Sequence, residues 1–238
     1  MENKGITICL TSCSRWDLLE KTIKSLVQFW DGPKPYEFLI YEDCGNEKYD
    51  KNQSGLSFYI PLVEFIRSVG WKISILGPKH IGQISAIDFL YSQVKTPYIF
   101  HCEDDFEFFN TGFIQKSLSI LEEKENIMQV WLRSPNDRNG HPCHGVAQKT
   151  TDGTKYHVLK TGYMGKWHGF SFNPGLRRLS DYQKLFPNGF ASEIPWNPKN
   201  PLESEILVGR KFFKNGYRAA TLLDGFCRHI GQNRHING

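Results

Sequence analysis

The chain has 238 residues, of which 39% are hydrophobic and 14% aromatic, a composition that is typical of a globular protein and excludes a disordered one. Its formal net charge is +4, and because the basic residues are scattered along the chain we predict no nucleic-acid partner. No apolar run approaches the ~20 residues of a membrane span and the first residues lack a signal-peptide pattern, so we expect a cytoplasmic protein without a transmembrane segment.

In the first hundred residues, strand patterns alternate with helix patterns. Short apolar or β-branched runs predict strands at 6–10, 36–41, 71–76 and 98–102. Apolar side chains three and four positions apart predict helices at 16–30, 58–69 and 82–94. We assign Ser14 as the N-cap of the first helix, place Pro61 in the first turn of the second, and expect a polar loop at 46–55. This order predicts βαβ units and a mostly parallel, Rossmann-like sheet flanked by helices.

The second half is more irregular but has no linker. We predict a helix at 112–125, a strand at 128–132 and hairpin pieces such as 156–159 within a loop-rich region, 134–165. A last helix at 202–215 is expected to bury Ile206, Phe212 and Phe213 and to end at Gly216 as its C-cap. We therefore expect one α/β domain over residues 1–238.

Cysteine usage gives no sign of a disulfide framework. The six cysteines are far apart and include no CxxC pair: Cys9, Cys13, Cys44, Cys102, Cys143 and Cys227. This spacing favours reduced thiols in an intracellular protein. The segment His141 to His144 has zinc-binding types of side chain but no second half at zinc spacing, so no zinc site is predicted.

Acidic residues follow two of the predicted strands. The run Tyr98 to Cys102 ends in Glu103, Asp104 and Asp105, and the strand before residue 42 ends in Glu42 and Asp43. Ligands of open α/β sheets lie at the carboxyl ends of the strands. Because neighbouring carboxylates repel one another, such a cluster favours a hard cation, although an exposed acidic turn would look the same in the sequence.

Six short motifs occur in a fixed order along the chain: Thr11-Ser12-Cys13-Ser14-Arg15; Glu42-Asp43-Cys44-Gly45; Gly82, Ala86 and Asp88; Glu103-Asp104-Asp105; Glu203-Ser204-Glu205 ahead of Gly216-Tyr217-Arg218; and His229-Ile230-Gly231. Together they resemble the motifs of GT-A-fold glycosyltransferases, most closely the large family-2 type. Glu103 replaces the first Asp of that family's DXD motif, Cys44 interrupts its Asp-Asp-Gly motif, and Ser204 separates its acidic pair.

The resemblance implies a GT-A fold and assigns roles to individual residues. Asp105 and His229 would bind Mn²⁺ or Mg²⁺, and Glu205, or alternatively Glu203, would be the general base. The donor-binding residues would be Thr11, Cys13, Arg15, Asp43, Asp88, Glu103, Asp104 and Arg228, with Arg234 as a further diphosphate contact. Trp167 and His168 are candidate sugar or acceptor contacts, since aromatic rings stack on sugars.

The activity that the resemblance implies is transfer of a sugar, hexosyl or related, from a nucleotide diphosphate sugar to a carbohydrate or glycoconjugate hydroxyl. The transfer would be inverting and metal-assisted, with residues 1–105 binding the donor and 106–238 the acceptor. Two alternatives stay open: a sugar-nucleotide nucleotidyltransferase, and a non-catalytic carbohydrate- or nucleotide-binding module on the same fold. The first alternative calls for a Gly-rich loop after the first strand, and Thr11 to Arg15 contains no Gly.

Overall fold

A five-stranded sheet is the centre of the fold. The computed structural model describes residues 5–43, 59–77, 79–195 and 201–232, so Cys44, Gly45, Arg234 and the loop predicted at 46–55 lie outside the described residues. The strand order is β3-β2-β1-β4-β9, in which the first four strands are parallel and β9 is antiparallel to β4. These strands are β1 (Ile6–Ser12), β2 (Glu37–Glu42), β3 (Ile73–Leu76), β4 (Tyr98–Glu103) and β9 (Gly175–Arg178). The predicted mostly parallel α/β sheet is confirmed.

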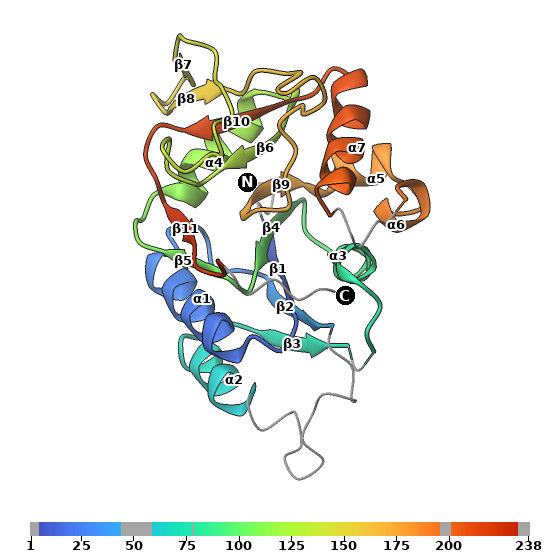
Figure 1. Cartoon of the computed structure of the whole chain (residues 1–238). Helices are drawn as coiled ribbons and strands as arrows, with labels where there is room; N and C mark the ends of the chain where they lie inside the picture. Colours follow the sequence, from blue (N-terminus) through green and yellow to red (C-terminus); the bar gives the residue numbers. More distant parts are fainter. Residues whose placement is uncertain (1–4, 44–58, 78, 196–200, 233–238) are drawn as a thin grey trace.

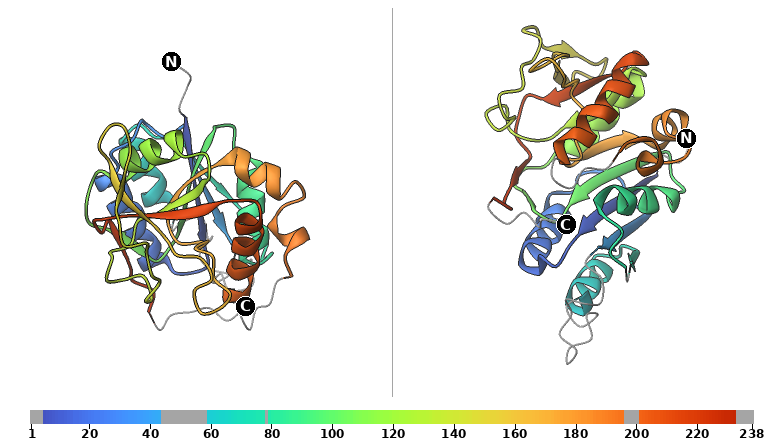
Figure 2. Two further views of the ribbon diagram at one scale, coloured as in Figure 1. Left: turned by 90° about the horizontal axis from the view of Figure 1, so that it is seen from above. Right: turned by 45° about the vertical axis from the view of Figure 1, so that its right-hand side comes forward.

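Helices cover both faces of this sheet because its strands are apolar on both sides (Figure 1). Along β1, Ile8 and Leu10 belong to one buried cluster, whereas Cys9 belongs to the other. Seen from above in Figure 2, one side carries α1 (Trp16–Phe29), α2 (Tyr59–Ser68) and α4 (Phe113–Glu123). The other side carries α3 (Gln83–Ser92), α5 (Leu179–Leu185), α6 (Phe190–Glu193) and α7 (Pro201–Lys214).

The second half of the chain adds a smaller sheet above the first (Figure 1). Its order is β6-β10-β8-β7, with β6 (Ile127–Trp131), β10 (Arg218–Leu222), β8 (Lys155–Val158) and β7 (Gln148–Lys149). A two-stranded ribbon pairs β5 (Phe106–Phe108) with β11 (Cys227–His229). This ribbon brings the end of the described chain back to the residues that follow β4.

Several local predictions can be compared directly with the structure. Gly216 ends α7 in a left-handed conformation with a φ of +87°, which confirms the predicted C-cap. The Ser14 N-cap is wrong, because α1 begins at Trp16, the N-cap position falls on Arg15, and no side-chain hydrogen bond in the described part of the chain caps the helix. Phe213 is only partly buried.

The described cysteines are not uniformly reduced. Cys9, Cys102, Cys143 and Cys227 are free thiols, but Cys13 is disulfide-bonded, so the expectation of reduced cysteines is wrong at Cys13. Burial raises the pKa of Cys9 and of Cys227, which keeps both thiols protonated and unreactive. None of the helices in the described part of the chain is both long and apolar enough to span a bilayer.

Candidate active site

The acidic motifs meet at the carboxyl edge of the central sheet. The chain runs outward from β1 to β2 and β3 and then returns to β4 on the other side of β1. This reversal creates a switch point between β1 and β4, the position where open α/β sheets bind ligands. In register, Ser12 pairs with Glu42 and Thr11 with Glu103, so the ends of β2, β1 and β4 lie side by side.

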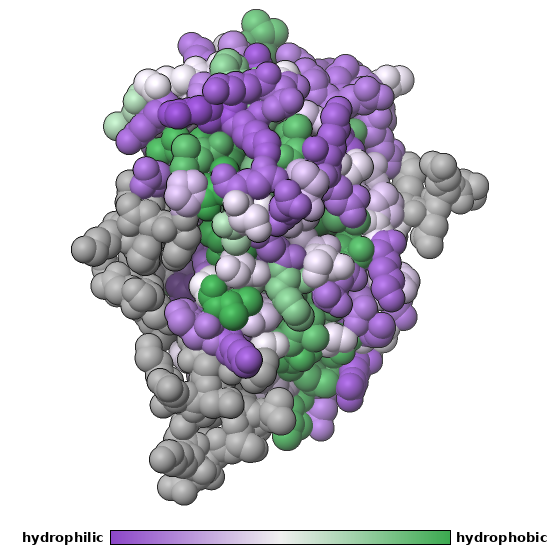
Figure 3. Space-filling view, turned by 90° about the vertical axis from the view of Figure 1, so that its right-hand side faces the viewer, coloured by the Kyte–Doolittle hydropathy of each residue, from purple (hydrophilic) through white to green (hydrophobic). Residues whose placement is uncertain are grey.

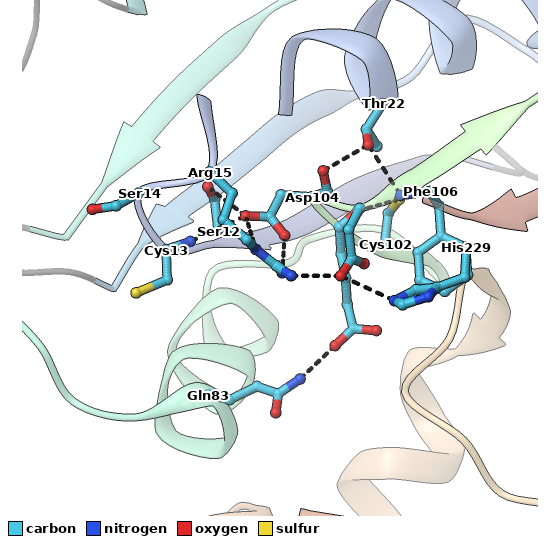
Figure 4. Close-up of polar contacts among 12 residues, drawn as sticks. Ser12, Cys13, Ser14, Arg15, Thr22, Gln83, Cys102, Asp104, Phe106 and His229 are labelled. Atoms are coloured by element: carbon cyan, nitrogen blue, oxygen red, sulfur yellow. Dashed lines mark hydrogen bonds and ion pairs between the residues drawn. The ribbon is translucent and has the colours of Figure 1, made fainter. Parts of the chain in front are cut away.

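Asp104 anchors the loop between β1 and α1 (Figure 4). Its carboxylate is fully buried and accepts hydrogen bonds from Ser12 Oγ at 3.0 Å, Cys13 N at 3.2 Å and Arg15 Nε at 3.2 Å, and Arg15 Nη2 bonds its second oxygen. Thr22 Oγ1 of α1 donates to the backbone oxygen of Asp104 at 2.8 Å. Burial raises the pKa of Asp104 to about 6, although the charge of Arg15 opposes the shift. Asp104 therefore fixes the loop, and all of its described contacts lie within the protein.

Asp105 points toward His229 on the β11 ribbon. Its Oδ2 lies 3.1 Å from His229 Nε2 and accepts a hydrogen bond from Arg15 Nη1 at 2.6 Å, whereas its buried Oδ1 has no hydrogen-bond partner among the described residues. Burial alone would raise the pKa of Asp105, but the His229 hydrogen bond and the Arg15 charge lower it. Ile230 N donates to the backbone oxygen of Asp105 at 2.8 Å, and a Cβ added to Gly231 would lie 2.3 Å from Oδ2. The ribbon thus closes tightly over this carboxylate.

Glu103 of β4 and Glu205 of α7 lie close enough for their charges to interact. Glu103 accepts a hydrogen bond from Gln83 Nε2 at the start of α3 (Figure 4). Burial and the charges of Asp105 and Glu205 raise the pKa of Glu103 well above that of an ordinary glutamate. Such mutual repulsion is what a bound cation would relieve.

The Glu205 side chain is held by the segment between β8 and β9. Glu205 Oε1 accepts hydrogen bonds from Phe172 N at 2.7 Å and Ser171 Oγ at 3.0 Å. Burial raises the pKa of Glu205, and these two donors and the charge of Arg177 act against the shift. Arg177 is itself buried and donates to the carbonyl oxygens of Ser171 at 2.6 Å and Asn173 at 3.3 Å, which fixes the segment. Glu203 lies in the first turn of α7, two residues before Glu205, and is partly buried.

The carboxyl ends of β1 and β2 lie beside these carboxylates. Thr11 is 7% exposed and lies in register between Tyr41 of β2 and Glu103 of β4. Asp43 Oδ1 accepts hydrogen bonds from Ile81 N at 2.6 Å and Gly82 N at 3.1 Å, so Asp43 joins β2 to the start of α3. Burial raises the pKa of Asp43, and those two N–H groups and His80 counteract it.

Other predicted site residues lie away from this cluster. Both carboxylate oxygens of Asp88 cap α6, accepting hydrogen bonds from Phe190 N at 2.8 Å and Ala191 N at 2.7 Å. Arg228 faces away from the site, because its neighbour His229 points inward and side chains alternate along a strand. The Arg228 side chain is 64% exposed and pairs with Glu107. In Figure 4 the sulfur of Cys13 points away from the Asp104 carboxylate.

The two aromatic candidates differ in their surroundings. Trp167 is partly buried, and its Nε1 donates to Phe170 O at 3.0 Å, within an aromatic group that includes Trp131 and His141. His168 stacks on Phe213 at 4.1 Å. Both rings therefore pack against other side chains of the protein, and no contact among the described residues joins either ring to Glu205.

Sequence reasoning missed the residues that position the carboxylates. Gln83 supports Glu103, Thr22 joins α1 to the residues after β4, and Ser171 and Arg177 support Glu205. Each contact joins residues far apart in the chain, except those of Arg177. Arg177 gives no local signal either, because β9 reads Gly-Leu-Arg-Arg and its two arginines look alike in the sequence, although Arg177 is buried and Arg178 only partly so.

The sheet order, the switch point and the ribbon over the β4 end define the GT-A fold of nucleotide-sugar glycosyltransferases, and solved structures with this fold match nearly the whole chain. GalNAc-T7 with UDP, GalNAc and Mn²⁺ superposes with a TM-score of 0.63 at 12% identity, covering 95% of this chain and 43% of that one. S. aureus TarS gives 0.59 at 15% identity, covering 94% of this chain and 36% of that one.

Mannosyltransferase PcManGT from Pyrobaculum calidifontis, in complex with GDP-Man and Mn²⁺, gives a TM-score of 0.65 at 12% identity and covers 96% of this chain and 57% of that one. The chain thus spans about half the length of these proteins, and identities this low concern the fold alone. No protein-family model and no curated protein matches the sequence.

Proposed function

We propose that the chain transfers a sugar from a nucleotide diphosphate sugar to an acceptor hydroxyl, with a divalent cation at Asp105 and His229 and with Glu205 as general base. The observation that carries the proposal is the meeting of Asp105, Glu103 and Glu205 at the switch point of a GT-A fold. Residues 1–105 would supply most of the donor site and residues 106–238 the acceptor side, within one catalytic domain.

The donor set at Asp105 fits a divalent cation. In the part of the chain that the structure describes, the buried Oδ1 of Asp105 has no hydrogen-bond partner, and His229 Nε2 lies 3.1 Å from Oδ2. Carboxylate oxygen combined with imidazole nitrogen suits Mn²⁺, and Mg²⁺ remains the alternative. No group of three or more His, Cys, Asp or Glu side chains in the described residues is arranged as a complete metal site. The protein would thus supply two ligands, and the donor diphosphate would complete the shell.

A cation bound there would neutralise charge on the departing diphosphate as a Lewis acid. The protein itself holds the charged side chains of the site in position. Arg15 holds Asp104 and Asp105 together, and the ribbon of β5 and β11 fixes His229 beside them. Because these groups are buried, they need little rearrangement to receive a donor.

Glu205 has the properties of a general base. It is held by Phe172 N and Ser171 Oγ, and it lies near enough to Glu103 to influence its pKa. A raised pKa brings a carboxylate closer to working pH and makes it a better proton acceptor, a role that contributes about 10²–10⁴ in rate. Inversion follows if the acceptor hydroxyl, once deprotonated by Glu205, attacks the anomeric carbon opposite the leaving diphosphate.

Nucleotide binding tests the donor site. Thermal unfolding would be followed with UDP, GDP, dTDP and CMP, each with and without Mn²⁺, for the wild type, Asp105→Asn and Glu107→Gln. A ligand at about 100 times its dissociation constant stabilises by about 2.7 kcal/mol. We expect one nucleotide to stabilise both the wild type and Glu107→Gln, and to do so only when Mn²⁺ is present. In Asp105→Asn we expect no stabilisation by that nucleotide with Mn²⁺. Glu107 is the matched control because it pairs with Arg228 outside the site.

Failure of all four nucleotides to stabilise the protein, with or without Mn²⁺, would count against the donor site. Equal stabilisation of the wild type and Asp105→Asn would count against the metal assignment. Metal-dependent binding without any release of nucleotide from a sugar nucleotide would favour the binding module over the enzyme.

A further inference from the structure

A concentration of positive charge lies around Arg218, away from the candidate active site. Arg218 begins β10, and its backbone N–H donates to Asn126 O at 2.8 Å, one residue before β6 begins. The candidate active site lies toward the opposite ends of the parallel strands β6 and β10. At those ends Arg133 forms a β-bridge with Cys227, and the charge of Arg133 acts on Glu205. The two locations are therefore separated by the length of the strands.

The Arg218 guanidinium is held in place without a carboxylate partner. It lies 4.6 Å from the centroid of the Phe213 ring, and that ring in turn stacks on His168. Its Nη1 donates to Tyr217 O at 2.7 Å. Among the described residues no carboxylate lies within ion-pair distance of Arg218. Since a guanidinium has five N–H donors in a fixed plane, most of them remain free for a ligand.

Arg218 lines a cavity of ≈ 300 Å³, which we call the Arg218 cavity. Its polar lining consists of Lys124, Asn126, His144, Gln148, Tyr156 and Arg218 and includes no carboxylate. The Gln148 Oε1 accepts a hydrogen bond from Tyr156 OH at 2.8 Å, which leaves the Gln148 amide N–H groups as donors. Lys124 is paired with Glu123, whose carboxylate is not part of the lining. The cavity lining thus supplies donors and the Arg218 cation, while the charge of Glu123 also reaches the lining at Tyr156.

The surroundings add to this positive field. Arg210 of α7 is exposed and, like Arg218, has no carboxylate partner among the described residues. Burial lowers the pKa of His168, and the charges of Arg210 and Arg218 lower it further, so both cations lie close to His168. In Figure 3 the upper part of the face that carries α7 is predominantly hydrophilic.

We propose that the Arg218 cavity binds a phosphate or sulfate oxyanion, either free or as the monoester of a small molecule. A planar guanidinium held by an aromatic ring, together with a lysine and side-chain amides among the other lining residues, supplies the charge and the donors that the oxygens of such an anion accept. The inference goes beyond the proposed function and does not depend on it, because none of the residues lining the cavity belongs to the candidate active site.

The test is a titration of the full 238-residue chain with inorganic phosphate and, separately, with glucose 6-phosphate at constant ionic strength. Amide chemical shifts at Ile127 and Val158, which line the cavity, report binding there. Asp105→Asn is included so that phosphate bound at the candidate active site is recognised separately. Arg218→Gln and Lys124→Gln remove one cation each, and Arg67→Gln on α2 removes a distant, exposed one.

We expect saturable shifts at Ile127 and Val158 in the wild type, Asp105→Asn and Arg67→Gln. Loss of a charge-assisted hydrogen bond weakens binding about tenfold or more. We therefore expect the affinity for the anion to fall by this factor in Arg218→Gln and by a smaller factor in Lys124→Gln. Tighter binding of glucose 6-phosphate would identify a monoester ligand, and equal binding would identify free phosphate. Shifts that do not saturate, or the same affinity in Arg218→Gln and the wild type, would overturn the proposal. Since Lys124→Gln leaves β10 intact, it keeps the test valid if Arg218→Gln does not fold.

Discussion

Gly231 is the position at which the smallest change should disturb the candidate metal site most. A Cβ at this position would lie 2.3 Å from Asp105 Oδ2 and 2.8 Å from Asp105 Cβ, distances that real Cβ atoms do not show. Asp105 has no room to move away, since it is 4% exposed and its backbone oxygen is fixed by Ile230 N. Its carboxylate is also held by Arg15 and His229. Forcing extra atoms into such packing typically costs about 1–3 kcal/mol.

We therefore expect Gly231→Ala to lower the free energy of unfolding by about 1–3 kcal/mol and to abolish Mn²⁺-dependent nucleotide stabilisation. Urea unfolding measures the first effect, and thermal unfolding with UDP or GDP measures the second. Gly145→Ala is the matched control, because nothing lies within 4 Å of a Cβ added there. If Gly231→Ala unfolds within about 0.5 kcal/mol of the wild type and still shows the Mn²⁺ effect, the close packing of the ribbon on Asp105 is refuted.

Three further predictions concern Arg15, Glu205 and Asp88. Arg15→Met leaves the fully buried Asp104 without its ion-pair partner, so we expect a loss of about 3–5 kcal/mol in urea unfolding, against a small change for the exposed Arg67→Met. A general base acts only when deprotonated, so the raised pKa of Glu205 in the free protein should place the acid limb of kcat/KM above the 4.5 of an ordinary glutamate, and a limb at or below 4.5 would exclude it. Asp88→Ala removes the acceptor for Phe190 N and Ala191 N, and we expect faster hydrogen exchange at these two amides and a loss of about 1–3 kcal/mol, whereas unchanged exchange would show that α6 does not need this cap.

Features that depend on local sequence were predictable. The strand patterns gave the parallel sheet, and a parallel sheet necessarily brings the residues after β1, β2 and β4 to one edge. Gly216 was identifiable because few other residues adopt a φ of +87° at the end of a helix. Short strands such as β9 and β11 were missed, because runs of three or four residues carry little periodicity.

Side-chain roles that depend on long-range contacts could not be read from the sequence. Asp104 and Asp105 are adjacent in the chain, yet one is enclosed by the β1–α1 loop and the other faces His229, 124 positions away. Asp88 was assigned to the donor site by its spacing from Glu103, but its carboxylate caps α6, an element that was not predicted. Arg228 is next to His229 in sequence and on the opposite face of β11, since the strand alternates.

The most direct test of the central claim is turnover of a sugar nucleotide by the wild type and by Glu205→Gln. Nucleotide release and the anomeric configuration of the product would be followed by NMR, with the donor chosen from the binding panel and a simple glycoside as acceptor. The proposed function predicts a product of inverted configuration, and a rate that falls about 10²–10⁴-fold in Glu205→Gln while nucleotide affinity is retained. A retained configuration, or a Glu205→Gln variant as fast as the wild type, would contradict the assignment of Glu205 as the base of an inverting glycosyltransferase.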